Sequence, residues 1–439
     1  MRRKLAVSAT LATLATALSV APSVASRAEA APRALTIDDA VALALRTNPQ
    51  LASARARAEA GDINAVSVGR RMLPAIHVSD EAQLWNAPFA IFFPSTTPST
   101  GPAPTTPPPA FVVRNRETNT FTASFDQPLM GLFRANDERE TLTEQSAGDR
   151  AQIAAGESDL RANVETQFLR VFEAQALEQI ASSSVHELGD QVTVAKARLA
   201  SGVITQADLL RIEVAVANAE QQALEAHSQG ATSRAQLFAA IGLSPADAAE
   251  LTLVAPEARL AAVRAKGSSP SLATLMPQAR DHRAELARQG HLILAADRQV
   301  GARTYALLPD IDLEGAYIRT DGQLFAPPNS AFLGIKASWA IWEWGASNLQ
   351  RKAAAVQADA ARRDQEMLAR QIEAELGASL AQGDAARGAV GTAEKAVASA
   401  EEAYRVTDAA LKAGTATTTD LLESQSALSQ ARLNLTRAQ

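Results

Sequence analysis

The titratable side chains of this chain form no recognisable catalytic or metal-binding motif. The five histidines are scattered and lack the paired spacing on one helix face that a zinc hydrolase needs. The chain also lacks a glycine-rich phosphate loop and the serine elbow of α/β-hydrolases. The histidines are His77, His186, His227, His282 and His291. We therefore expect no catalytic residue, no metal site and no cofactor, and interpret these histidines as surface or interface residues.

Acidic side chains do recur at two related positions. Residues 199–210 and 411–422 share one pattern, in which Gly202 and Asp208 correspond to Gly414 and Asp420. Glycine commonly ends a helix, and an aspartate is common at the start of the next one. The pattern therefore predicts two helix–turn–helix tips, at 201–208 and 414–420. The copies differ one turn further on, where the first carries Arg211 and the second carries Glu423.

A second pair of matching segments shows that the whole chain is duplicated. Residues 48–51 correspond to 283–286, and the Leu-Pro pair at 73–74 corresponds to the pair at 308–309. This offset exceeds that of the two tips by 23 residues, so the first half contains an insertion. The proline-rich run at 94–109 explains it, because proline cannot donate to a strand ladder. We expect an exposed hairpin loop there, and a duplicated architecture overall.

The start of the chain has the features of an export signal. A basic segment, an apolar segment at 5–20 and an Ala-Glu-Ala site at 28–30 predict a signal peptide over residues 1–30, with a membrane anchor as the less favoured alternative. The formal net charge is −6 for the whole chain, and removing the signal makes it more acidic. An exported acidic chain is a poor candidate for binding nucleic acid. The chain has no cysteine, and thus no disulfide and no lipid-modified cysteine.

Each half is predicted to run helix, strand, strand, long helix, tip and returning helix. The first half spans 31–243, with strands near 75–86 and 116–126 and a long helix at 134–200. A linker at 244–271 leads to the second half at 272–439, with strands near 310–320 and 331–340 and a long helix at 345–413. A helix of nearly 70 residues would be about 100 Å long. Such helices are rare in a globular core.

The four predicted strands have the length and the alternation of membrane strands. Each approaches the 9–11 residues that cross a bilayer when tilted, with one apolar face. An open four-stranded sheet would leave backbone groups unpaired in lipid, so copies of the chain must close it, as a dimer or a trimer. Asp312 and Glu314 alternate with the apolar residues of their strand, so their side chains are expected on the opposite face, toward the lumen. Trp339, Trp342 and Trp344 are expected at the membrane interface, or else in packing at the barrel junction.

Taken together, these motifs resemble the TolC family of outer-membrane efflux channels over essentially the whole mature chain. The resemblance is carried by the segment at 35–51, the two Leu-Pro pairs, residues 126–129 with their counterpart at 339–345, and the two glycine–aspartate tips. It implies a mainly α fold with a membrane β-barrel portion. It further implies a homotrimeric channel-tunnel, in contact with outer-membrane lipid and with its helical barrel in the periplasm.

The resemblance also implies roles for the tips. Gly202, Val203, Gly414 and Thr415 match the surface that docks a periplasmic adaptor, which connects the channel to an inner-membrane pump. Asp420 and Glu423 match inward acidic positions at the entrance, with Asp208 and Arg211 as their counterparts in the first tip. The alternative for both aspartates is that they only cap helices.

Two features depart from the best-known family members. The tyrosine and arginine that latch the entrance are replaced by Leu411 and Ala416, so we expect Arg211 to reach Glu423 instead. The last helix is about 15 residues shorter than its first-half counterpart, which predicts a truncated C-terminus. The function expected is passive exit for a tripartite efflux or type I secretion system. The alternative is a non-pore periplasmic or secreted coiled-coil protein.

Overall fold

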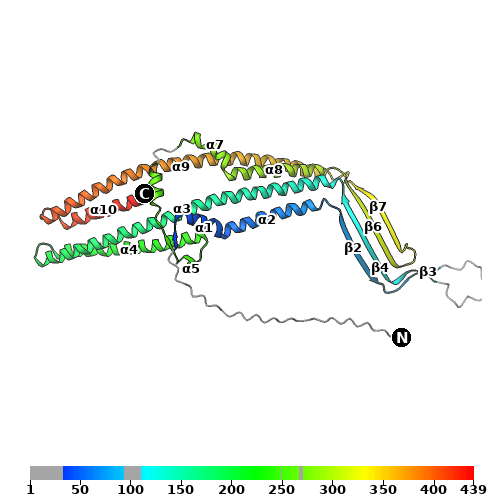
Figure 1. The fold of residues 1–439 in the computed structure, drawn as a ribbon, viewed down its shortest axis with the longest axis horizontal. Coiled ribbons are helices and arrows are strands. Elements are labelled where there is room, and N and C mark those ends of the chain that lie inside the picture. The colour runs from blue at the N-terminus through cyan, green and yellow to red at the C-terminus, as the bar shows by residue number, and fades with distance from the viewer. Residues whose placement is uncertain (1–32, 93–109, 249, 266–269) are drawn as a thin grey trace, which may run out of the picture.

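The structure is a computed structural model that describes residues 33–92, 110–248, 250–265 and 270–439. The predicted signal peptide at 1–30 and the whole proline-rich loop at 94–109 lie outside these residues. The described chain forms a long rod, with a β-sheet at one end and two helical hairpin tips at the other (Figure 1). The mainly helical fold class predicted from the sequence is thereby confirmed.

Four helices build the first half of the rod. They are α1 (Ile37–Thr47), α2 (Pro49–Arg70), α3 (Gly131–Ala200) and α4 (Gln206–Ile241). The first predicted helix of this half is two helices, α1 and α2, which are separated at Asn48 because a residue before proline avoids the α region. Asn48 instead caps α2, since its side-chain oxygen accepts hydrogen bonds from the amides of Gln50 and Leu51.

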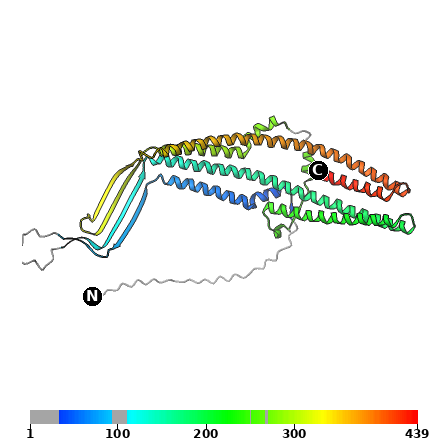
Figure 2. The same cartoon turned by 180° about the vertical axis from the view of Figure 1, so that it is seen from behind.

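The second half repeats this arrangement. It contains α7 (Leu272–His282), α8 (Ala284–Tyr305), α9 (Ala346–Lys412) and α10 (Thr418–Ala438). Helices α3 and α4 form one antiparallel hairpin, and α9 and α10 form the other (Figures 1 and 2). Helix α8 packs against both α3 and α9, so it joins the two halves in the part of the rod next to the sheet (Figure 1).

The largest apolar core lies midway along the rod, where α1 packs across α3 and α4. Val164, Phe168 and Val171 of α3 are essentially solvent-free, as are Leu237 and Ile241 of α4. The segment predicted as a linker contributes to this core through α5 (Pro245–Ala248) and β5 (Leu251–Leu253). Helix α6 (Glu257–Ala265) follows them. Strand β5 pairs in parallel with β1 (Arg33–Leu35), a long-range pairing that neither short segment signals by itself.

The sheet is antiparallel, in the order β2-β4-β6-β7. Its strands are β2 (Ala75–Leu84), β4 (Ala110–Pro128), β6 (Asp310–Gln323) and β7 (Asn329–Ser338). Strand β4 starts earlier than the predicted 116, because Phe111 and Val112 belong to an apolar run that pairs with a further strand, β3 (Phe89–Phe92). The sequence analysis missed β3. Within the described residues, the outer edges of β2 and β7 have no partner strand.

Register separates the two faces of the sheet. Residues that are directly paired share a face, so Val78, Ala123 and Tyr317 lie on one face together with Ile76 and Phe125. The other face is polar. It carries His77, Ser79, Thr122, Ser124, Asp126, Asp312, Glu314 and Lys336. The sheet therefore has one side suited to lipid and one suited to water. Among the described helices, none is both long and apolar enough to cross a membrane.

Candidate functional site at the helical tips

Each tip is a tight turn that depends on one glycine. Gly202 and Gly414 have φ values of 73° and 78°, in the left-handed region that side chains with a Cβ avoid. The tips place Val203 and Thr415 at the surface, and Val203 is 69% exposed. The Thr415 hydroxyl donates to the Ala410 carbonyl at 3.2 Å, which closes the end of α9.

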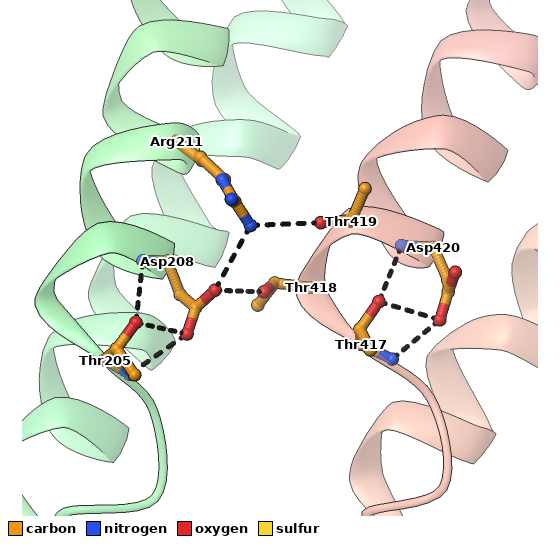
Figure 3. Close-up of polar contacts among 7 residues, drawn as sticks. All are labelled: Thr205, Asp208, Arg211, Thr417, Thr418, Thr419 and Asp420. Carbon is orange, nitrogen blue, oxygen red and sulfur yellow. Dashed lines mark hydrogen bonds and ion pairs between the residues drawn. The ribbon is translucent and has the colours of Figure 1, made fainter.

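A reciprocal capping box begins each returning helix (Figure 3). In the first, the Asp208 amide donates to the Thr205 hydroxyl at 3.3 Å, and the Thr205 amide donates to an Asp208 carboxylate oxygen at 3.0 Å. In the second, Asp420 and Thr417 make the same two bonds at 3.2 and 2.8 Å. The N-caps are therefore the threonines. The two aspartates lie in the first turn and complete the boxes.

These bonds determine how the two carboxyl groups titrate. Hydrogen bonds from the Thr205 side chain and amide hold the pKa of Asp208 below its usual value. The amide and side chain of Thr417 do the same for the pKa of Asp420. Both groups are thus anchored in the protomer as ionised carboxylates, and these bonds are the ones that the capping alternative describes.

Two side-chain contacts join the tips to each other (Figure 3). The second carboxylate oxygen of Asp208 accepts a hydrogen bond from the Thr418 hydroxyl at 3.3 Å, and the Arg211 guanidinium donates to the Thr419 hydroxyl at 3.5 Å. Arg211 also lies 3.7 Å from Asp208. The expected contact of Arg211 with Glu423 is not formed within the protomer, because the guanidinium turns toward Asp208 and Thr419.

Thr418 and Thr419 were missed by the sequence analysis. The signal was a run of three threonines at 417–419, where the first copy has a single threonine followed by glutamine and alanine at 205–207. The side chain of Thr418 is buried, and that of Glu423 is exposed. The two threonines that only the second tip carries, Thr418 and Thr419, are therefore the partners of Asp208 and Arg211 in the contacts between the tips.

The other predicted site residues lie at the opposite end of the rod. Asp312 and Glu314 lie on the polar face of the sheet, where Glu314 is directly paired with Asp126 and Asp312 with Lys336. Trp339 donates its indole N–H to the Leu307 carbonyl at 3.3 Å. Trp342 and Trp344 contact edge to face, with ring centroids 5.6 Å apart, and are 74% and 86% exposed. No cluster of three or more metal-ligating side chains occurs within the described ranges.

Comparison with known proteins decides what class of molecule this is. The sequence model of the outer membrane efflux protein family matches residues 40–243 and again residues 275–439. The chain belongs to the outer membrane efflux protein family. Members of this family are outer-membrane channel proteins rather than enzymes, and the double match falls on the two duplicated halves.

Individual relatives agree with this assignment. The outer membrane efflux protein BepC of Brucella suis is 24% identical over 332 residues, which cover 74% of this chain and 69% of BepC. The outer membrane protein VceC of Vibrio cholerae has the same fold, with a TM-score of 0.73, 17% identity and 92% coverage of both chains. The CmeC channel of Campylobacter jejuni has a TM-score of 0.73 at 14% identity, covering 92% of this chain and 82% of CmeC.

Membership in the outer membrane efflux protein family places the two ends of the rod. The sheet with its apolar face belongs in the outer membrane, and the helical part extends into the periplasm. The tips therefore lie at the periplasmic end (Figure 2). The tryptophans at 339, 342 and 344 lie between the end of β7 and the start of α9, where the sheet meets the helices.

Proposed function

We propose that three copies of this chain close into one duct that gives passive exit across the outer membrane. The unpaired outer edges of β2 and β7 carry the proposal. In lipid each unpaired backbone group is costly, so the β7 edge of one protomer must pair with the β2 edge of the next. Three copies of four strands give a twelve-stranded barrel, whose polar inner face conducts and whose apolar outer face contacts lipid.

The two halves, 31–243 and 272–439, would contribute equivalent pieces of this wall, joined by the segment at 244–271. Strand pairs from both halves form one continuous sheet, and the long helices continue it as a tunnel. The passive duct needs an energised partner, which would be an inner-membrane pump acting through a periplasmic adaptor. The exposed tips, with Gly202, Val203, Gly414 and Thr415, present the surface that such an adaptor would hold.

The contacts between the tips would keep the periplasmic entrance closed. The bonds from Thr418 to Asp208 and from Arg211 to Thr419 hold the two hairpins of a protomer side by side. The Arg211–Thr419 contact is exposed, so water can replace it when the tips separate, whereas the Thr418–Asp208 bond is part-buried and holds the hairpins more firmly. Asp420 and Glu423 would form two rings of three carboxylates around the entrance, which would favour cations.

The central experiment is outer-membrane fractionation, followed by electrophoresis of unheated and heated samples and by conductance in planar bilayers. We expect an outer-membrane trimer that dissociates on heating and a low closed-state conductance. Replacing both tip contacts, with Arg211→Ala and Thr418→Val, leaves the capping boxes intact and should raise the conductance several-fold. A monomer without channel activity would contradict the duct, and an unchanged conductance of the double variant would contradict the gate.

A further inference from the structure

The two halves of the chain correspond to each other at two constant offsets. Helices α2 and α8 have the same length, and each residue of α2 and β2 corresponds to the one 235 positions later, as Pro74 does to Pro309. Each residue of β4 and α3 corresponds to the one 212 positions later in β7 or α9, as Gly202 does to Gly414. Contacts made in one half therefore predict contacts made in the other.

Two independent observations confirm these offsets. Arg150 of α3 forms an ion pair with Asp62 of α2, and the corresponding residues of α9 and α8, Arg362 and Asp297, form an ion pair as well. In the sheet, the register of β2 on β4 reappears without any shift as the register of β6 on β7. The correspondence thus holds both for side-chain contacts and for strand pairing.

One interface of the described protomer is not repeated within it. The first half meets the second where β4 pairs with β6 and α3 packs against α8, which we call the inner seam. The corresponding elements are β7 with β2 and α9 with α2. Strands β7 and β2 lie at opposite edges of the sheet, so only a second copy can bring β2 and α2 to β7 and α9 (Figure 1). We call this interface between copies the outer seam.

We infer that the outer seam has the register of the inner seam but is sealed by apolar side chains where the inner seam is sealed by charged ones. The inference rests on the proposed trimer. The observed pairing of Ser124 with Ala316 translates into Lys336 opposite Glu81 of the next copy. Both side chains lie on the polar face of the sheet, so opposite charges meet across the strands. A shift of one residue would turn the apolar faces of the two copies to opposite sides.

The end of β7 shows what the second copy would supply. Strand β4 continues to Pro128, and the next residue, Leu129, still donates its amide to the Ile311 carbonyl of β6 at 2.8 Å. Strand β7 ends at Ser338, two residues before the counterpart of Pro128. The counterpart of Leu129 is Ile341, whose side chain is 78% exposed. Pairing with β2 of the next copy would extend β7 into this segment.

The helical part of the two seams differs in chemistry. Three pairs of titratable side chains join α3 to α8 and β6 across the inner seam. They are Arg134 with Asp310, Asp137 with Arg298, and Glu144 with His291. The counterparts of all six residues are apolar. In the same order they are Ala346 with Ala75, Leu349 with Ile63, and Val356 with Ala56.

A single copy leaves the larger of these apolar side chains in water. Leu349 and Val356 lie two turns apart on one face of α9 and are 62% and 68% exposed. Ile63 and Val66 lie one turn apart on one face of α2 and are 62% and 58% exposed. Aliphatic side chains gathered on two faces that correspond to a packed interface gain free energy when those faces meet. The partner that fits both faces is a second copy of this chain.

Engineered disulfides in the outer-membrane fraction test the register, because the natural chain has no cysteine. Directly opposite side chains have Cβ atoms about 4.5–5.5 Å apart, and diagonal neighbours lie farther apart, at about 7–8 Å. Glu81→Cys with Lys336→Cys should therefore give covalent dimers and trimers on non-reducing denaturing gels, which reduction returns to monomers. Glu81→Cys with Gly334→Cys, shifted by two residues on the same face, is the matched control and should cross-link several-fold less. Equal or stronger cross-linking of the shifted pair would overturn the register.

A charge placed in the outer seam tests its apolar character. Leu349→Asp puts a carboxylate where the inner seam has Asp137, but without a neighbouring cation, and should lower the temperature at which the trimer band disappears. Ala355→Asp is the matched control on α9. Its counterpart Thr143 stays exposed although α3 has neighbours on both sides, so this variant should dissociate as the wild type does. Equal effects of the two aspartates would contradict an apolar seam at Leu349.

A second substitution distinguishes a lost contact from general damage. Ile63→Arg, added to Leu349→Asp, recreates the inner pair of Asp137 and Arg298 across the outer seam and should restore part of the lost heat resistance. A double variant no more resistant than Leu349→Asp alone would show that these positions do not meet. If the wild type runs as a monomer in unheated samples, the proposed trimer itself fails. If it runs as a trimer but Glu81→Cys with Lys336→Cys does not cross-link, only the outer seam fails.

Discussion

At the scale of single residues, the tips show how one carboxyl group serves two purposes. Asp208 uses one oxygen for the capping box and offers the other to Thr418 on the neighbouring hairpin. Asp420 has the same box, and no contact with the first hairpin is formed through its carboxylate. The duplication supplied two equivalent capping boxes. Only the Asp208 box also contacts the other hairpin, because Thr418, which follows the second N-cap, donates to it.

The capping boxes make the tips sensitive to acid. The pKa of each aspartate is lowered in the folded state, so its contribution to stability is complete above the unfolded-state pKa of about 3.9. That contribution is lost as the pH falls through the folded-state pKa. Amide hydrogen exchange at Thr205 and Thr417 should therefore lose protection at acidic pH in the wild type. Asp208→Asn and Asp420→Asn should remove this pH dependence, and protection that is independent of pH in the wild type would contradict it.

Asp137 of α3 should behave in the opposite way. Its side chain is nearly buried against Gly301 of α8. Burial raises its pKa, Arg298 at 4.0 Å lowers the pKa in part, and the Glu140 carboxylate raises it further. Burial penalises the ionised form, so this penalty is absent below the unfolded-state pKa and grows as the pH rises through the raised folded-state pKa. Asp137→Asn should therefore raise the heat resistance of the trimer at neutral pH, but not at pH 4. Thr143→Val, an exposed position on the same helix, is a control.

At the scale of elements, the sheet depends on a close backbone approach between β4 and β6. A Cβ at Gly322 would lie 2.2 Å from the Glu117 carbonyl oxygen, and its φ of 84° is left-handed. Gly322→Ala should cost about 1–2 kcal/mol from the backbone conformation alone, with the clash in addition. When samples are heated to increasing temperatures before electrophoresis, the trimer band of this variant should disappear at a lower temperature than that of the wild type. Gly334→Ala on β7, where nothing lies within 4 Å, should leave dissociation unchanged; equal effects of both changes would contradict this account.

At this scale, the sequence predicted the features that neighbouring residues determine and missed those that depend on pairing between distant segments. The tips were predictable because a glycine that ends one helix and an aspartate in the first turn of the next lie within a few residues of each other. The parity of Asp312 and Glu314 was predictable because side chains alternate along a strand. Asp126 was missed as their neighbour, since its pairing with Glu314 depends on a register across nearly two hundred residues. Strand β1 was missed for the same reason, because its partner lies in the predicted linker.

At the scale of the whole molecule, duplication and trimer closure would turn isolated side chains into rings. In the protomer, Asp126, Asp312 and Glu314 lie together on the polar face near the helical end of the sheet, with Lys336 as the neighbouring cation. In a closed barrel three such groups would face one lumen. Carboxylates of like charge around a narrow water-filled space attract cations and repel anions. The alternative of a coiled coil without a pore gives these residues no such role.

This arrangement predicts cation selectivity that arises in the barrel as well as at the tips. In a potassium chloride gradient, Asp126→Asn combined with Glu314→Gln should shift the reversal potential toward zero. The shift should shrink near 1 M salt, where the Debye length falls to about 3 Å and the carboxylates are screened. Asp80→Asn is the matched control, because Asp80 is paired with Phe121 on the apolar face of the same sheet and so points away from the lumen. If Asp80→Asn shifts the potential as much as the lumen variant does, the two faces have been assigned wrongly, and closure of the barrel would have to place the other side of the sheet inward.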